Sequence, residues 1–224
     1  ASLSVILSSS WGPWVRRRRS TGQERTPVER LDLGEWKRIV VIVVLAVFVI
    51  VFWMGFEQAG GTMTLFADEK TNRSFFGTFV PASSFQSINP LLVILLAPVF
   101  SRMWSRLDAS RFRLSTPVKM GLGMIVLGLG FIVMYVGDRL SMTSGRVSPL
   151  WLVAVYFFHT CGELCLSPIG LSMVTKLAPA RMVSLLMGLW LLSSAIANYL
   201  AGHIEALLHT VGWPIYGFLM CASM

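Results

Sequence analysis

Residues 39–56, IVVIVVLAVFVIVFWMGF, contain no charged side chain and decide the class of the protein. A helix needs about 20 mostly apolar residues to cross the hydrocarbon core of a bilayer. The segment lacks the period-2 alternation of a barrel strand, and in lipid a lone segment can satisfy its backbone groups only as a helix. The sequence therefore predicts a membrane-spanning helix at this position.

Further apolar segments of spanning length follow along the chain. The expected spans are residues 39–57, 84–101, 119–137, 149–175 and 182–204, with the start of a sixth at residue 213. The composition agrees, because 54% of the residues are hydrophobic and only 13% are charged, against about 25% charged in an average soluble domain. We therefore expect an all-α integral membrane protein and exclude a soluble enzyme or a disordered regulator.

The 19 Lys and Arg residues fall unevenly on the two sides of these spans. Fifteen lie before the first span, between the second and third, or between the fourth and fifth, and four lie in the other connections. The positive-inside rule then puts the N-terminal segment in the cytoplasm. We expect residues 1–35 to be a cytoplasmic linker and residues 36–224 to be the membrane bundle. The arginine run 16–19 is interpreted as a flank of the first span and not as a nucleic-acid site.

Only two of the 11 acidic residues lie in the expected membrane segments, namely Glu57 at the end of the first span and Glu163 within the fourth. A carboxylate at mid-membrane costs about 2.5 kcal/mol or more, so such residues usually face a cavity, a partner or a proton path. Apart from Lys119, which bounds the third span, no Lys or Arg lies inside the five spans. If Glu163 is ionised, its cation must come from elsewhere in the protein or from a substrate; otherwise it is protonated. The structural alternative is a protonated carboxyl group hydrogen-bonded between helices.

The surroundings of Glu163 are also polar. His159, Glu163 and Ser167 are four residues apart and share one face of a helix. Pro168 and Gly170 follow, and we expect them to break or kink this helix at mid-depth, where transporters built on discontinuous helices bind their substrates. His159 alone would more often be a packing residue.

Two further polar groupings lie on other spans. Trp190, Ser194 and Asn198 are spaced by four along the fifth span, and Asn89 lies three residues after Gln86 at the start of the second. Hydrogen bonding between helices is an equally good explanation of each residue alone. The three cysteines form no CxxC pattern, so the sequence predicts no metal site.

Four ordered motifs resemble the proton-dependent oligopeptide transporter family. They are FEQAG with TLFAD (residues 56–60 and 64–68), FQSINPLLVILLAPVF (85–100), GELCLSPIGLSMVTKLAPAR (162–181) and MGLWLLSSAIANYLAG (187–202). The resemblance covers about residues 26–224. It implies the carboxyl-terminal six-helix half of a major facilitator superfamily transporter, with the last helix cut short. We expect the chain to be a piece of a larger protein, because it begins with Ala1 and ends within an apolar segment.

The resemblance implies proton-coupled symport of di- and tripeptides, in a cytoplasmic membrane such as the bacterial inner membrane. Glu57 matches the family's carboxylate for proton coupling and gating, and Glu163 matches the glutamate that faces the amino terminus of the peptide. Asn89, Trp190 and Ser194 match positions that line the substrate pocket. No cofactor is implied beyond the proton. The family's first-helix signature is absent from this sequence, so we expect the missing amino-terminal half to supply the rest of the site.

Three other functions were weighed. A nitrate- or drug-type carrier on the same scaffold is the nearest alternative. An intramembrane hydrolase would need Ser167 and His159 to act together, but two helical turns separate them by about 12 Å. A purely structural membrane scaffold is disfavoured by the two membrane glutamates.

Overall fold

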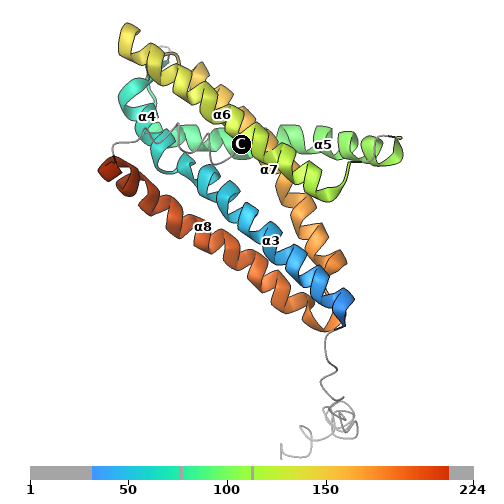
Figure 1. The fold of residues 1–224 in the computed structure, drawn as a ribbon. Helices are drawn as coiled ribbons and strands as arrows, with labels where there is room; N and C mark the ends of the chain where they lie inside the picture. The colour runs from blue at the N-terminus through green and yellow to red at the C-terminus, as the bar shows by residue number, and fades with distance from the viewer. Residues whose placement is uncertain (1–31, 76–77, 112–113, 212–224) are drawn as a thin grey trace, which may run out of the picture. The chain divides into compact units, whose positions relative to one another are not determined.

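The computed structural model describes residues 32–75, 78–111 and 114–211. Five of its helical segments are long and apolar enough to span a membrane, in the order that the sequence predicts. Their main helices are α3 (Leu33–Phe56), α5 (Ile88–Ala109), α6 (Thr116–Ser144), α7 (Leu150–Leu177) and α8 (Val183–Val211) (Figure 1). The expected start of a sixth span at residue 213 and nearly all of the expected linker 1–35 lie outside the described residues.

Most helices extend a few residues beyond the predicted spans, because polar residues at the ends continue the same backbone hydrogen bonding. The connection after the first span also holds a short helix that the sequence did not predict, α4 (Thr62–Lys70). It is followed by a hairpin of β1 (Ser74–Phe75) and β2 (Thr78–Phe79) and by the 3-10 turn η2 (Ala82–Ser87). A 3-10 turn η3 (Ala180–Met182) joins α7 to α8.

Helices α6 and α7 form the most extensive contact of the bundle. Gly123 of α6 faces Gly162 of α7, and a Cβ atom added to either glycine would lie 2.8 Å from the backbone oxygen of the other. Small residues are what allow two membrane helices to approach this closely. The backbone on both sides of this contact is therefore held in place by direct packing.

Helix α3 supplies a second part of the core. Ile42, Val49 and Phe52 are fully buried, and Gly55 packs against Leu127 and Phe131 of α6. Five valines of α3, at positions 40, 41, 43, 44 and 47, are exposed, as expected of a helix whose outer face meets lipid or further protein.

Helix α3 is also connected to the α8 region near both of its ends. Arg181 in η3 forms an ion pair of 2.6 Å with Glu35, and the Gln58 side chain donates to the backbone oxygen of Ala201 at 3.1 Å. These two contacts require α3 and α8 to run in the same direction. The first and fifth spans therefore enter the membrane from the same side, as the charge distribution predicts.

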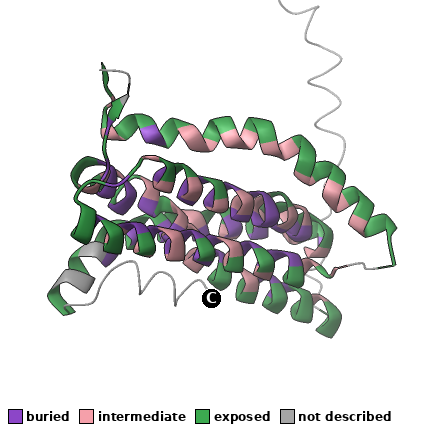
Figure 2. Cartoon of the chain, turned by 90° about the horizontal axis from the view of Figure 1, so that it is seen from above, coloured by how far each residue is buried: buried purple, intermediate pink, exposed green. Residues whose placement is uncertain are grey.

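Helix α5 differs from the other spans in its packing. None of its residues is buried, and Figure 2 shows it along one margin of the bundle. Among the long helices its main contact is with α7. Leu91, Ile94 and Leu95 are exposed, so this helix needs lipid or further protein to cover it.

The structure corrects one expectation about α7. We predicted a break or kink at Pro168 and Gly170. The helix is not broken, because α7 continues without interruption from Leu150 to Leu177, and the kink stays a prediction. Proline removes one backbone donor, and membrane helices tolerate this loss when neighbouring groups compensate. Gly170 instead accommodates a neighbouring helix, because the indole of Trp190 occupies the space that a Cβ atom would need. A part for these two residues in gating stays a prediction.

Candidate functional site

Glu163 lies in the middle of α7 and is half-buried. The amide nitrogen of Asn89, on α5, donates to Glu163 Oε2 at 3.1 Å and to Thr160 Oγ1 at 3.0 Å. The Thr160 hydroxyl in turn donates to the backbone oxygen of Tyr156 at 2.7 Å. Asn89 therefore orients the carboxylate from a different helix, and it brings together two of the site residues that the sequence predicted.

A cavity of about 160 Å³ adjoins this contact. It is lined by Phe56, Ala59, Gln86, Asn89, Tyr156 and His159. Asn89 both lines the cavity and holds Glu163. His159 is 2% exposed and packs against Phe131, with ring centroids 4.8 Å apart and the ring planes inclined by 59°. Neither of its ring nitrogens has a hydrogen-bond partner among the residues that the structure describes.

Glu57 begins the 3-10 turn η1 (Glu57–Ala59), where α3 ends. The side-chain amide of Asn198, on α8, faces both carboxylate oxygens of Glu57. With its nitrogen turned toward the carboxylate, the amide donates to Oε1 at 3.1 Å and to Oε2 at 3.2 Å. Glu57 is thus the second membrane carboxylate that an asparagine from another helix orients.

The residue after Glu57 fixes the backbone of this turn. Gln58 is 2% exposed, and besides its bond to the Ala201 backbone it accepts a hydrogen bond of 2.7 Å from Thr62 Oγ1. The glycine pair 60–61 follows. Glu57 itself is exposed, so its carboxylate lies at the surface of the bundle while the neighbouring glutamine holds the turn to α8.

Neither glutamate forms an ion pair with a Lys or Arg in residues 32–75, 78–111 and 114–211. A carboxylate in a membrane helix without a cation of its own is costly unless another group compensates. Each carboxylate instead has one amide donor. Both sites can therefore accept a proton or a further cationic group.

Trp190 and Ser194 lie on α8, at the predicted spacing before Asn198. Trp190 is 6% exposed and packs against Gly170 of α7, and Ser194 is half-buried. No hydrogen bond within the described part of the chain joins either residue to Glu57 or Glu163. Their assignment to the substrate pocket stays a prediction.

Sequence reasoning did not assign roles to Thr160, Gln58 or Asn198. The spacing of Trp190, Ser194 and Asn198 did indicate that Asn198 shares a helix face with two predicted site residues. Nothing in the sequence paired it with Glu57, because the two residues come from opposite ends of the chain. Thr160 and Gln58 lie next to apolar or packing positions and carry no spacing signal.

A family model described as the POT family matches residues 20–216. The chain belongs to the POT family. Members of this family are secondary transporters and not enzymes. Together with the five spanning helices, this membership makes the chain part of a multi-pass membrane transporter of the major facilitator type, corresponding to its carboxyl-terminal helical half.

Curated relatives of this POT-family chain include the peptide transporter YePEPT of Yersinia enterocolitica, which is 44% identical over 75% of this chain and 34% of the relative. A di-/tripeptide transporter of Lactococcus lactis is 34% identical over 80% of this chain and 36% of its own length. The chain thus spans about a third of the length of these relatives.

Solved structures of POT proteins are similar in fold. A mutant peptide transporter POT in complex with alafosfalin has a TM-score of 0.75 at 33% identity, with 98% of this chain and 47% of that chain covered. A peptide transporter POT in complex with sulfate has a TM-score of 0.76 at 36% identity, with coverages of 88% and 39%.

Proposed function

We propose that the full-length protein is a proton-coupled symporter of di- and tripeptides, and that this chain supplies half of its binding site. The observation that carries the proposal is the contact of Asn89 with Glu163 beside a cavity. It holds a membrane carboxylate at mid-helix without a cation from the described residues. The free amino terminus of a peptide is a cation of the right charge to meet it. The names of the relatives, which are peptide transporters, support the same substrate class.

In this mechanism Glu163 receives the ammonium group of the peptide, and Asn89 keeps the carboxylate oriented for it. The amino-terminal half supplies the groups that receive the peptide carboxylate. Trp190 and Ser194 contribute to the side of the pocket formed by α8. A ligand without the ammonium group would leave the buried carboxylate unpaired, which is costly. Binding therefore favours peptides with a free amino terminus.

Glu57 is the proton-coupling group. When it is ionised, Asn198 donates to its carboxylate and joins the end of α3 to α8. Protonation removes the negative charge that strengthens this hydrogen bond, so η1 and α8 can separate at the carboxylate while Gln58 still anchors the turn. Alternating access follows if this local change accompanies the opening of one face of the bundle. No cofactor is needed beyond the proton.

The experiment is a transport assay on the full-length protein in proteoliposomes. Counterflow of a labelled dipeptide is compared with counterflow of nitrate and of a cationic drug, and uptake is then driven by an inward proton gradient. We expect dipeptide counterflow alone, and accumulation only with the gradient. Counterflow of nitrate or drug without dipeptide exchange would assign the protein to another carrier class of the same fold.

The proposed orientation puts the N-terminal segment in the cytoplasm of a bacterial cell. Single cysteines labelled from outside should react in residues 68–74 and stay unreactive in residues 105–115. The reverse labelling pattern would overturn this orientation.

A further inference from the structure

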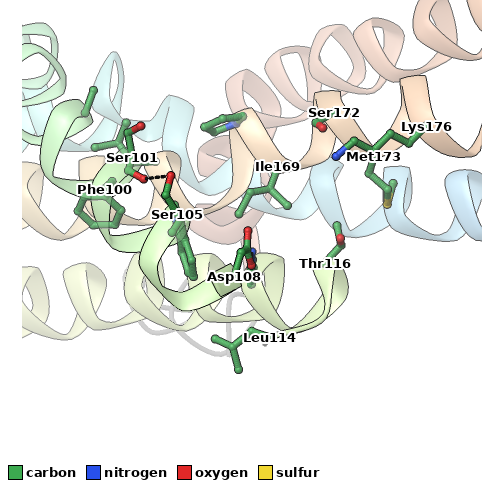
Figure 3. Close-up of a pocket in the computed structure, with 15 residues that line it drawn as sticks. Phe100, Ser101, Ser105, Asp108, Leu114, Thr116, Ile169, Ser172, Met173 and Lys176 are labelled. Carbon is green, nitrogen blue, oxygen red and sulfur yellow. Dashed lines mark hydrogen bonds and ion pairs between the residues drawn. The ribbon is translucent and has the colours of Figure 1, made fainter. Parts of the chain in front are cut away.

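A second and larger cavity, of about 600 Å³, lies between α5, α6 and α7 (Figure 3). It is separate from the two carboxylate sites, since it contains neither Glu57 nor Glu163. Its lining includes Asp108 near the end of α5, Lys119 near the start of α6 and Lys176 near the end of α7. The charge distribution assigns these helix ends to the cytoplasmic side.

The lining changes from mainly apolar to mainly polar along α5 and α7. Its deeper part is formed by Ala97 and Phe100 of α5 and by Leu164 and Ile169 of α7. Serine residues 101, 105 and 172 follow, and the charged residues lie nearest the helix ends. Because α5 and α7 both run toward the cytoplasm, their cavity-lining residues change from apolar to polar in the same direction. The cavity therefore has an apolar inner part and a cationic mouth.

The mouth carries an excess of positive charge. Lys119 is 7% exposed, pairs with Asp108 at 2.5 Å and lies 5.0 Å from the centroid of the Trp104 ring. Lys176 is exposed and forms no ion pair within the part of the chain that the structure describes. Two lysines thus face one carboxylate.

The two lysines differ in whether their charge is balanced. Lys119 pairs with Asp108, whereas Lys176 forms no ion pair within the described residues. An anion bound at the mouth would balance the charge of Lys176.

We propose that this cavity binds an anionic phospholipid of the cytoplasmic leaflet. The phosphate lies at the mouth, near Lys119 and Lys176, and an acyl chain follows the apolar inner part. Basic pockets between membrane helices on the cytoplasmic side are suited to such headgroups. A free phosphate ion would use the same mouth, but it would leave the apolar part without an occupant.

The test is native mass spectrometry of the purified full-length protein with phosphatidylglycerol or phosphatidylcholine added. We expect phosphatidylglycerol to be retained more strongly. A basic residue near an anionic leaflet contributes about 1 kcal/mol, so Lys176→Gln should lower this retention about 5-fold. Lys70→Gln is the matched control, because Lys70 pairs with Asp138 at the opposite end of the bundle, and it should retain phosphatidylglycerol like the unchanged protein.

Asp108→Asn sharpens the test, because it removes the one carboxylate that the described residues contribute to the mouth, and it should raise phosphatidylglycerol retention. A merely destabilised protein would lose lipid and not gain it. Equal retention of the two lipids, or equal behaviour of Lys176→Gln and Lys70→Gln, would overturn the proposal. If excess inorganic phosphate displaces the bound lipid, we would conclude that the ligand of this cavity is a free anion and not a phospholipid.

Discussion

Glu57 and Glu163 are both membrane carboxylates oriented by an asparagine from another helix, but their backbones are held differently. Glu163 lies inside a continuous helix, next to Gly162, whose backbone packs directly on α6. Its asparagine comes from α5, in which no residue is buried. Glu57 lies where a helix ends, and its turn is held to α8 by the side chain of Gln58.

The difference indicates how the two sites can change. At Glu163 the carboxylate is fixed and its partner helix can move, which suits a group that must meet a substrate at a constant position. At Glu57 the partner belongs to α8 and the carboxylate ends a helix, which suits a group whose change of charge must alter the contact between elements. Five substitutions, the last with a matched control variant, test this contrast.

The largest effect is expected for Glu57→Gln in the full-length protein. The amide has nearly the same shape but cannot bind or release a proton, so accumulation driven by a proton gradient should be lost. Counterflow, which needs no net proton movement, should continue. Uptake assays with and without the gradient measure both. Normal accumulation by this variant would remove Glu57 from the coupling mechanism.

Glu163→Gln should act on affinity and not on coupling. Loss of a buried charge partner costs about 2–5 kcal/mol, or about 30-fold or more in dissociation constant. We expect this loss for free dipeptides, and little change for amino-acetylated analogues that bring no positive charge. Competition binding with both ligand series provides the measurement. An equal loss for both series would show that the glutamate does not meet the amino terminus.

The two asparagines should differ in the same way. Hydrogen bonds to charged groups contribute about 1.5–3 kcal/mol, so Asn89→Ala should weaken dipeptide binding about tenfold or more. Asn198→Ala should leave binding unchanged and lower the ratio of gradient-driven uptake to counterflow. If both variants affect binding alike, the two carboxylates do not have separate roles.

The smallest effect concerns the fixed backbone beside Glu163. Gly123→Ala places a methyl group against the Gly162 backbone, and overpacking of this kind costs about 1–3 kcal/mol. Gly121→Ala is the matched control, since nothing lies within 4 Å of its added Cβ atom. Thermal unfolding in detergent should show a lower midpoint for Gly123→Ala only. Equal midpoints would mean that the α6–α7 contact does not fix the position of Glu163.

The five spans could be predicted from sequence because their signal is local. The segment 39–56 is apolar throughout, and its length matches the membrane whatever surrounds it. The helix α4 was missed because nine residues of mixed polarity do not specify a helix without the contacts around them. No break occurs at Pro168, because proline removes only one backbone donor, while the helix on both sides is held by packing.

The site was predictable only in part, for a related reason. A carboxylate in an apolar segment stands out in the sequence, so Glu57 and Glu163 could be found. The partner of a carboxylate is set by tertiary structure. Asn198 lies 141 positions after Glu57 in the chain, and no local pattern connects them. Asn89 was named from a family resemblance, but its contact with Thr160 followed only from the packing of α5 on α7.

The contact between Gln58 and α8 has a consequence for how the family can vary. Gln58 donates to a backbone oxygen, so any residue small enough to fit at position 201 keeps the bond. Keeping Gln58 therefore restricts the size of the residue at position 201 but not its chemical type. An alignment of relatives should show these two positions varying independently, although they touch. Distance restraints inferred from correlated substitutions would therefore miss the attachment of η1 to α8, whereas the side-chain pair of Gln58 and Thr62 should vary together.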